Sequence, residues 1–257
     1  MTSKYRAIMA RDCTLKLIMI PWLPSEPCFP PLATALPNGL LAAGGDLAPA
    51  RLLKAYRAGI FPWYAEGEPI LWWSPDPRLV LVPGAMKISR SLAKTLRNAD
   101  YEVRCDCDFA AAMAACAAPR AGASGTWISP EMRAAYLRLH ELGHAHSVEV
   151  WSQGRLSGGL YGVAMGAVFY GESMWSGVRD ASKIALAHLC RHLERHAYAV
   201  IDCQMNTPHL CSLGAGEISR SEFAALLERH AGNQANPAQA PGRWRENAMA
   251  DLYVQDS

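Results

Sequence analysis

The sequence lacks a strong excess of charge of either sign. Its 25 Lys and Arg residues against 23 Asp and Glu residues leave a formal net charge of +2 at pH 7. A balance this close to neutrality does not by itself indicate a nucleic acid or a membrane as partner, so such a partner has to be inferred from local clusters. With 51% hydrophobic residues in 257, the chain can bury a large core in one big or two smaller domains.

Paired cysteines and long hydrophobic runs are missing as well. The eight cysteines form no C-x-x-C pair, and most lie in apolar runs such as HLCRHL and VIDCQM. This pattern favours reduced thiols in a cytoplasmic protein over a disulfide framework. The N-terminal run CTLKLIMIPWL is short, is interrupted by Lys16 and precedes no A-x-A cleavage site. We therefore predict neither a signal peptide nor a transmembrane helix.

One stretch, HELGHAHSVEVW, contains the H-E-x-x-H pattern of zinc metalloproteases, in which a single helix carries both histidines. Upstream of it, Ser129 suits the N-cap of a helix and Pro130 its first position. Gly143 suits the left-handed residue after a helix, and the residues that follow alternate as in a strand. We predict that the helix ends between His140 and His144 and that no metal binds there. A zinc metalloprotease remains an alternative.

Hydrophobic periodicity predicts a mixed α/β protein. Helices are expected near 89–98, 107–118, 129–142 and 180–197, the last capped by Asp180, and strands near 79–82, 101–105, 146–151, 155–164, 167–175 and 198–204. Nearer the N-terminus we expect one short helix, with Asp46 as cap, Pro49 at its start and Gly59 at its end. An antiparallel meander, a crossing helix and a further strand is the order found in acetyltransferase-like folds.

Composition divides the chain into four segments. We predict an N-terminal extension over 1–26, a small N-terminal domain over 27–77, a catalytic domain over 78–230 and a linker-like C-terminal tail over 231–257. No internal repeat is present.

Several strings occur together in this chain: PNGLLAAGGDL, AGIFPWY, PILWWSPDPR, GTWISPEM, HELGHAHSVEVW, GESMWS, ASKIAL, IDCQ and SLGAGEISR. Together they resemble the leucyl/phenylalanyl-tRNA-protein transferases over about residues 29–225. The resemblance implies an aminoacyltransferase that moves leucine or phenylalanine, with methionine as a third candidate, from aminoacyl-tRNA to an N-terminal Arg or Lys of a protein. The product is marked for degradation by the N-end rule.

The resemblance also implies an architecture and a set of partners. It predicts α/β (α+β) architecture, with a small N-terminal domain and an acetyltransferase-like C-terminal domain built on a mostly antiparallel sheet. Aminoacyl-tRNA and the acceptor protein are the expected partners, without a cofactor, a metal or a membrane. We expect a cytoplasmic monomer.

The expected reaction is attack by an α-amino group on an activated ester, which requires proximity, removal of a proton and stabilisation of an oxyanion. Period-2 alternation in the strand YAVIDCQ places Asp202 and Gln204 on one face and Cys203 on the other. The resemblance implies that Gln204 lies nearest the amine and that Asp202 polarises it. A buried, hydrogen-bonded structural role for Asp202 stays open. Cys203 has no adjacent His in the sequence to activate it as a nucleophile.

Glu172 is the second acidic candidate. An N-terminal Arg or Lys brings two positive charges, so its site needs carboxylates. Alternatively, Glu172 is a solvated residue at the end of an apolar strand.

An apolar pocket is needed for the leucine or phenylalanine side chain. The resemblance assigns it to Leu160 and Phe169 on facing strands and to Leu186 and Leu189 on the crossing helix. Ordinary core packing is the alternative for all four.

Two kinds of residue are candidates for binding the tRNA. The resemblance implies that Trp63 and Trp127 contact the 3′ adenosine, although each can also be a buried core aromatic. Lys87, Arg90, Lys94 and Arg97 are spaced by three or four and form a basic stripe on a helix. Such a stripe is either a solvated face or, as the resemblance favours, a site for the acceptor-arm phosphates.

Two further classes of protein stay open as alternatives. An acetyl-coenzyme A-dependent acetyltransferase needs a glycine-rich pyrophosphate loop before the crossing helix, where this chain has SGVRDASK. A non-catalytic RNA-binding module leaves Asp202, Gln204 and Glu172 without a role.

Overall fold

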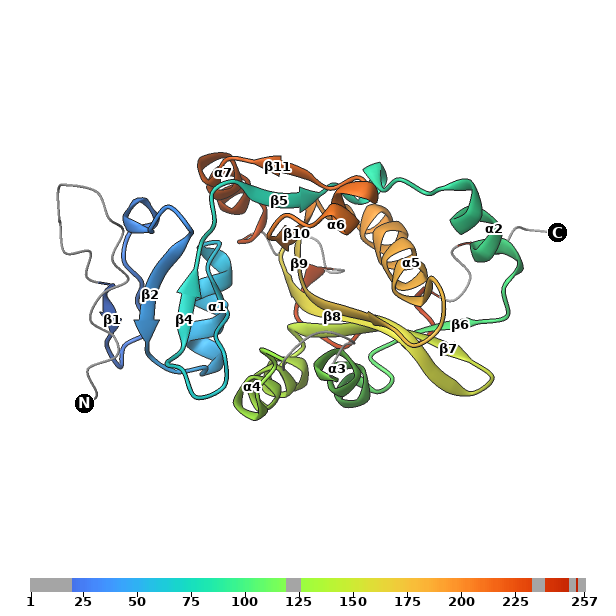
Figure 1. Ribbon diagram of the computed structural model, residues 1–257, viewed down its shortest axis with the longest axis horizontal. Coiled ribbons are helices and arrows are strands. Elements are labelled where there is room, and N and C mark those ends of the chain that lie inside the picture. The colour runs from blue at the N-terminus through green and yellow to red at the C-terminus, as the bar shows by residue number, and fades with distance from the viewer. Residues whose placement is uncertain (1–19, 119–125, 233–238, 250–252, 254–257) are drawn as a thin grey trace.

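Two β-sheets form the framework of the protein, as the computed structural model in Figure 1 shows. The structure describes residues 20–118, 126–232, 239–249 and 253. Most of the predicted N-terminal extension and residues 233–238 of the predicted linker therefore lie outside the described residues. The domain boundaries stay predictions.

The smaller sheet belongs to the N-terminal part and has the order β1-β2-β4-β3. Its strands are β1 (Trp22–Leu23), β2 (Leu40–Gly44), β3 (Phe61–Pro62) and β4 (Leu71–Trp73), with the 3₁₀ turn η2 (Leu32–Thr34) before β2. We did not predict these strands, because short apolar runs such as LLAAG do not distinguish a strand from a helix by periodicity.

The short helix expected in this part is α1 (Pro49–Arg57). It starts at Pro49, and Gly59 lies beyond its end with a φ of 73°. The prediction of Asp46 as its N-cap is wrong, because Ala48 occupies that position. The Asp46 carboxylate instead accepts the backbone N–H of Ala48 at 2.9 Å, which closes the turn before the helix.

The larger sheet has the order β11-β5-β10-β9-β8-β7-β6. Its strands are β5 (Arg78–Leu81), β6 (Glu102–Cys105), β7 (Ala145–Ser152), β8 (Arg155–Met165), β9 (Val168–Ser176), β10 (Val200–Gln204) and β11 (Gly216–Ile218). Every neighbouring pair is antiparallel except β9 with β10. A mixed α/β fold with a mostly antiparallel sheet and a small N-terminal domain is therefore confirmed.

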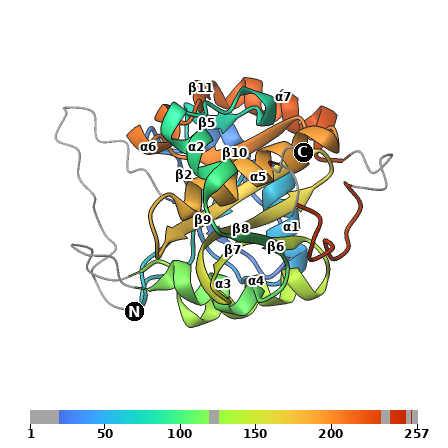
Figure 2. The same ribbon diagram turned by 90° about the vertical axis from the view of Figure 1, so that its right-hand side faces the viewer.

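Helices cover both faces of the larger sheet (Figures 1 and 2). They are α2 (Arg90–Asn98), α3 (Phe109–Ala117), α4 (Pro130–Glu141), α5 (Ala181–Arg195), α6 (Pro208–Ser212) and α7 (Arg220–His230), with the 3₁₀ turn η3 (Pro83–Ala85). The helices α3 and α4 lie on one face, and α5 lies on the other. Strand alternation sends Tyr161 and Tyr170 to the α4 face, and Leu160 and Phe169 to the α5 face.

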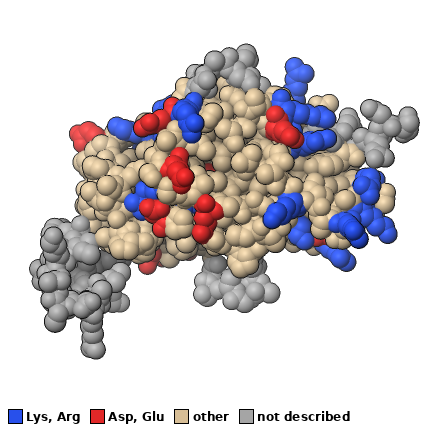
Figure 3. All heavy atoms as spheres, turned by 90° about the horizontal axis from the view of Figure 1, so that it is seen from above, with Lys and Arg blue, Asp and Glu red and all other residues tan. Residues whose placement is uncertain are grey.

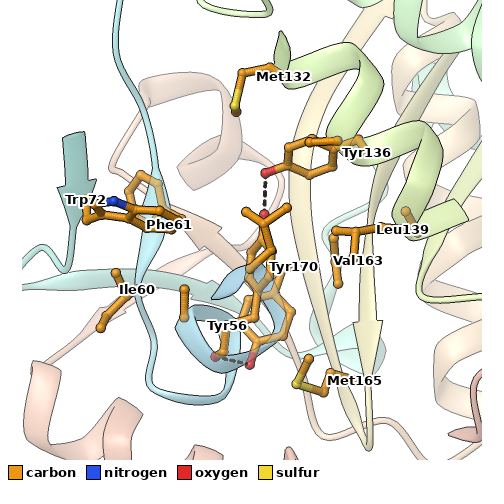
Figure 4. Packing of buried hydrophobic residues seen from close by; sticks show 14 of the residues in the cluster. Tyr56, Ile60, Phe61, Trp72, Met132, Tyr136, Leu139, Val163, Met165 and Tyr170 are labelled. Atoms are coloured by element: carbon orange, nitrogen blue, oxygen red, sulfur yellow. Dashed lines mark hydrogen bonds between the residues drawn. The ribbon is translucent and has the colours of Figure 1, made fainter. Parts of the chain in front are cut away.

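The core on the α4 face extends into the N-terminal part. One cluster of buried side chains contains Tyr56 of α1 and Trp72 of β4 together with Tyr136 of α4 and Tyr170 of β9 (Figure 4). Because these residues pack in one continuous apolar region, the N-terminal part contributes directly to what lies on this face of the larger sheet.

The parallel strands β9 and β10 pair over only part of their length. Their register runs from Val168 opposite Val200 to Tyr170 opposite Asp202, although β9 continues to Ser176. At the end of β10 a bulge falls between Asp202 and Gln204, and Gln204 has a φ of 63°. The two strands are therefore no longer paired after Tyr170 and Asp202. We call this point the split between β9 and β10.

The helix α4, which includes His140 and Glu141 of HELGH, ends where the sequence predicts. Ser129 caps α4 by accepting the backbone N–H of Met132 at 3.2 Å, and the helix ends at Glu141. Gly143 follows with a φ of 76°, and β7 begins at Ala145. Since the helix stops between the two histidines, they do not share a helical face.

Two expectations need correction. Asp180 occupies the N-cap position of α5, but its side chain does not cap the helix and contacts Lys183 Nζ at 2.8 Å. Described residues of the tail are packed, which its linker-like composition did not indicate: Met249 is 0% exposed and lies in the cluster on the α5 face.

Within the described ranges, no helix is long and apolar enough to cross a membrane.

Candidate active site

A buried carboxylate lies where β9 and β10 separate. Glu172 Oε1 accepts hydrogen bonds from Tyr56 Oη at 2.7 Å and from Gln204 Nε2 at 3.2 Å. Its Oε2 accepts one from Tyr136 Oη at 3.0 Å, and the two tyrosine hydroxyls contact each other. Three elements, α1, α4 and β10, thus hold a carboxylate of β9, and Figure 4 shows Tyr56 and Tyr136 converging from their helices.

The surroundings of Glu172 change its acidity. Burial raises its pKa to about 7, and the charge of Asp202 adds to this effect, while hydrogen bonds from Tyr56, Tyr136 and Gln204 oppose it. Burial also raises the pKa values of both tyrosines well above their ordinary value, so they stay neutral donors. Glu172 is only 9% exposed, so the alternative of a solvated edge residue is wrong. A carboxylate that titrates near neutral pH is suited to accept a proton from an amine.

Asp202 forms a bidentate ion pair with Arg78 of β5. Arg78 Nε lies 2.8 Å from Asp202 Oδ1 and Nη2 lies 2.6 Å from Oδ2, with the two side chains 1% and 0% exposed. The guanidinium also packs over the rings of Phe61 and Phe223, at 4.8 Å from each centroid. Asp202 Oδ1 additionally accepts the backbone N–H of Gln204 at 2.9 Å. This bond holds Gln204 in its left-handed conformation, from which its side chain reaches Glu172.

The predicted separation of Asp202 and Cys203 onto opposite faces is confirmed. Asp202 bonds Arg78 beside Phe61 and Phe223 of the core on the α4 face, whereas Cys203 packs against the cluster on the α5 face. Burial raises the pKa of the Cys203 thiol well above its ordinary value. A thiol that stays protonated is a poor nucleophile.

The four residues predicted to line the apolar pocket are brought together on the α5 face. Leu160 of β8, Phe169 of β9 and both Leu186 and Leu189 of α5 belong to one cluster and are at most 3% exposed. They lie on the face of the sheet opposite Glu172, whose partners Tyr56 and Tyr136 belong to the core on the α4 face. The structure therefore groups these residues without separating a pocket from ordinary core packing.

The two predicted tryptophans lie on neighbouring loops. Trp63 follows β3, is 41% exposed and packs edge-on against Trp73 at 5.7 Å between ring centroids. Trp127 is partly buried against the core on the α4 face. The side chain of Tyr64 lies close to that of Ser129, so the segments that carry the two tryptophans adjoin. An exposed aromatic face of this kind can stack with a base.

The basic residues gather on α2 and just before it. Arg90, Lys94 and Arg97 are exposed on the helix, whereas Leu92 and Leu96 are buried on its other side. Lys87 precedes the N-cap Ser89, so it extends the stripe without belonging to the helix. Figure 3 shows Lys and Arg side chains concentrated at the right-hand end of the molecule, where Figure 1 places α2.

Sequence reasoning missed three residues of this site. Tyr56, Arg78 and Tyr136 were not singled out as candidates for the site. The available signal for Arg78 was a charged residue at the start of the buried strand RLVL. For the tyrosines no local signal exists, because their partner Glu172 is 116 and 36 residues away.

Comparison with known proteins decides the family. Residues 80–228 match the family described as "Leucyl/phenylalanyl-tRNA protein transferase", and residues 45–76 match its N-terminal domain. The chain belongs to this family. The resemblance inferred from the sequence is confirmed, and neither a zinc metalloprotease nor an acetyl-coenzyme A-dependent acetyltransferase is supported. Leucyl/phenylalanyl-tRNA protein transferases are aminoacyltransferases, so the chain is an enzyme.

Relatives named leucyl/phenylalanyl-tRNA–protein transferase match most of the chain. The relative from Azoarcus sp. (strain BH72) is 63% identical over 226 residues, which are 87% of this chain and 96% of the relative. That from Aromatoleum aromaticum is 60% identical over 236 residues, 91% and 98% of the two chains. That from Chromobacterium violaceum is 62% identical over 214 residues, 82% and 92% of the two chains.

Proposed function

We propose that this enzyme transfers leucine or phenylalanine from aminoacyl-tRNA to the N-terminal Arg or Lys of an acceptor protein and forms a peptide bond. The product would be a substrate for N-end-rule degradation. The observation that carries the proposal is Glu172, a buried carboxylate with a pKa of about 7 at the split between β9 and β10. In this proposal Glu172 receives the cationic amine and accepts its proton.

The proton steps follow from the contacts around Glu172. The α-ammonium of the acceptor protein loses one proton to the Glu172 carboxylate. The side-chain amide of Gln204 donates to Glu172 through Nε2, so its oxygen remains available to accept an N–H of the amine. The neutral amine then attacks the ester carbonyl. The tetrahedral intermediate expels the 3′ oxygen of the tRNA, which takes up a proton as it leaves.

Asp202 acts through Gln204 in this proposal. Its bonds to Arg78 and to the backbone N–H of Gln204 fix the amide beside Glu172. Its negative charge also helps keep the pKa of Glu172 high, after burial. Asp202 is thus a positioning residue, and Glu172 is the group that takes the proton.

The remaining candidates would hold the aminoacyl-tRNA. The residues Leu160, Phe169, Leu186 and Leu189 would receive the leucine or phenylalanine side chain, Trp63 and Trp127 the 3′ adenosine, and Lys87, Arg90, Lys94 and Arg97 the acceptor-arm phosphates. The ester is already activated, so the reaction needs no ATP, metal or covalent enzyme intermediate. We further propose a cytoplasmic, monomeric enzyme.

Purified protein mixed with leucyl- or phenylalanyl-tRNA and short peptides tests the proposal. Peptides that begin with Arg or Lys should gain one residue by mass spectrometry, with and without chelator, and a peptide that begins with Ala should not. Transfer only in the presence of a metal, or acetylation of the same peptides by acetyl-coenzyme A, would contradict it.

A further inference from the structure

The HELGHAH stretch has a binding partner within the chain, namely the C-terminal segment Gly242–Met249. Gly242 N donates to Gly143 O at 2.9 Å, and Arg243 Nη2 donates to His140 Nε2 at 3.3 Å. One residue further on, the ring of Trp244 stacks on that of His146, with centroids 4.2 Å apart and an angle of 4°. Three successive residues of the segment therefore contact three positions of this stretch.

Gly143 is required for this approach as well as for the end of α4. A Cβ at this position would lie 2.4 Å from Gly242 N, closer than real Cβ atoms come to other heavy atoms. Its φ of 76° also disfavours any other residue. A side chain here would therefore displace the C-terminal segment.

A buried carboxylate fastens the same segment. Asp106 Oδ2 accepts hydrogen bonds from His146 Nδ1 and from the backbone N–H of Trp244, both at 2.9 Å, and its Oδ1 accepts the N–H of Ser147. Burial alone would raise the pKa of Asp106, but these bonds, with His146 foremost, lower it below its usual value. If the C-terminal segment left this site, the buried charge of Asp106 would lose one of its donors, the backbone N–H of Trp244.

The other side of the docked segment reaches the residues proposed to receive the aminoacyl side chain. The Trp244 ring lies 5.9 Å from that of Phe169 and 5.0 Å from that of His192 on α5. Met249 is fully buried in the cluster that contains Leu160, Leu186 and Leu189. His188, between those two leucines on α5, hydrogen-bonds Met249 O at 2.8 Å.

We infer that HELGHAH is a docking platform for the segment Gly242–Met249, and that the docked segment sets the size of the pocket for the aminoacyl side chain. The second half of this inference rests on the proposed function. Trp244 is a positioning residue here, because its ring packs against that of Phe169. With Trp244 in place the Phe169 ring cannot retreat, which keeps the pocket small and favours leucine over the bulkier phenylalanine.

Amide hydrogen exchange tests the docking without any assay of activity. Gly143→Ala should release the segment, and the amides of Trp244 and Cys105 should exchange faster, because Cys105 N donates to Glu246 O at 2.8 Å. Gly154→Ala is the matched control. Gly154 has a φ of 70° but no atom near its would-be Cβ, so it carries the backbone strain without the clash. Unchanged exchange in Gly143→Ala would overturn the docking.

The size of the pocket is tested by the ratio of leucyl to phenylalanyl transfer, measured as kcat/KM where the variants remain folded. Trp244→Ala should shift this ratio towards phenylalanine by about three- to tenfold, somewhat less than a direct change of one methylene in a pocket achieves. Tyr253→Phe, which loses only the bond of Tyr253 to Ala187 O, should keep the wild-type ratio. A lower melting temperature with an unchanged ratio would overturn the role in specificity. If the wild type transfers neither residue, the proposed function itself fails, while the exchange result still decides the docking.

Discussion

The ion pair of Asp202 with Arg78 determines what a substitution at either residue can reveal about catalysis. Both side chains are buried, and Arg78 has Asp202 as its ion-pair partner. Removing one charge leaves the other buried without compensation, which is costly. Asp202 therefore contributes to folding and to the position of Gln204 at the same time, and the two contributions need separate measurements.

Asp202→Asn should lower both stability and kcat. The unpaired Arg78 should reduce the free energy of unfolding by about 3–5 kcal/mol. Among folded molecules, kcat should fall because Gln204 is no longer fixed beside Glu172, by less than the roughly hundred- to ten-thousand-fold expected for loss of the proton acceptor itself, and the KM for tRNA should change little. Denaturant unfolding and steady-state kinetics measure the two effects. Cys203→Ala, on the opposite face, serves as control and should stay active; loss of transfer in that variant with activity retained in Asp202→Asn would indicate a thiol relay.

Glu172 should give the reaction its dependence on pH. Its pKa of about 7 means that the carboxylate form, which accepts the proton, predominates only above that pH. For the wild type, kcat/KM for an Arg peptide should therefore rise as Glu172 ionises and fall as the peptide amine loses its proton near about 8, because the reaction starts from the Glu172 carboxylate and the ammonium form of the amine. In Glu172→Gln only the ionisation of the amine should remain, at a much lower rate. An unchanged profile would assign the proton to another group.

At the scale of elements, α2 carries residues proposed to bind the tRNA and none proposed to take part in the reaction. It buries Leu92 and Leu96 and exposes Arg90, Lys94 and Arg97, so its charged side is free to meet an extended anion. Contacts to phosphates contribute affinity that depends on salt and not on sequence.

Charge reversal at Arg90 and Lys94 should weaken the binding of tRNA and leave chemistry intact. The KM for aminoacyl-tRNA should rise and its dependence on salt should become shallower, because fewer counterions are released on binding. A minimal aminoacyl-adenosine donor, which has no distant phosphates, should react as with the wild type. An equal loss with both donors would instead indicate a disturbed fold or a direct role in the reaction.

The glutamate of HELGH, Glu141, is the last residue of α4, and its surroundings predict that transfer does not require it. Glu141 is exposed and pairs with Arg138 at 2.7 Å, away from the buried ring of His140. Glu141→Gln should therefore leave aminoacyl transfer unchanged, whereas the general base of a zinc protease could not be replaced in this way. Metal analysis of the purified protein should find less than one zinc per chain. One tightly held zinc, lost on substitution of His140, would contradict this interpretation.

At the scale of the whole molecule, Glu172 makes stability depend on pH. Its pKa in the folded protein, about 7, exceeds its ordinary value of 4.5, so on raising the pH the unfolded chain loses this proton first. The stability of the folded state should then fall between about pH 4.5 and 7 and stay lower above that range. Asp106 acts in the opposite sense at acid pH. Its pKa is lowered on folding, so its contribution is present above its usual value of 3.8 and is lost as the pH falls through the folded value.

Glu172→Gln should therefore be more stable than the wild type at pH 8 and not at pH 4. The gain should be about 1–3 kcal/mol, because the shift in pKa corresponds to roughly 3 kcal/mol and a neutral amide cannot accept from both tyrosines equally well. Thermal unfolding of both proteins at the two pH values measures the difference. Equal stability at pH 8 would mean that Glu172 ionises as easily in the folded protein as in the unfolded chain.

The sequence by itself determined the features that depend on neighbours along the chain. Ser129, Pro130 and Gly143 specify the two ends of α4 by local capping and backbone preference, which excluded the metal geometry of HELGH. Alternation along β10 separated Asp202 from Cys203 for the same reason. The strings that resemble the family could also be recognised from the sequence without a structure.

Only the tertiary structure decided the features that depend on residues far apart in the chain. Periodicity gives a direction to a side chain and not a partner, so it could not find that Tyr56 and Tyr136 bind Glu172 or that Arg78 pairs with Asp202. These contacts join the helices α1 and α4 with three strands of the larger sheet, β5, β9 and β10. The raised pKa of Glu172 has the same origin, because burial is a property of the assembled fold. The C-terminal segment is the clearest example of a feature that only the tertiary structure decides. Its composition indicates a linker, whereas its position is set by the surface that HELGHAH and α5 form together.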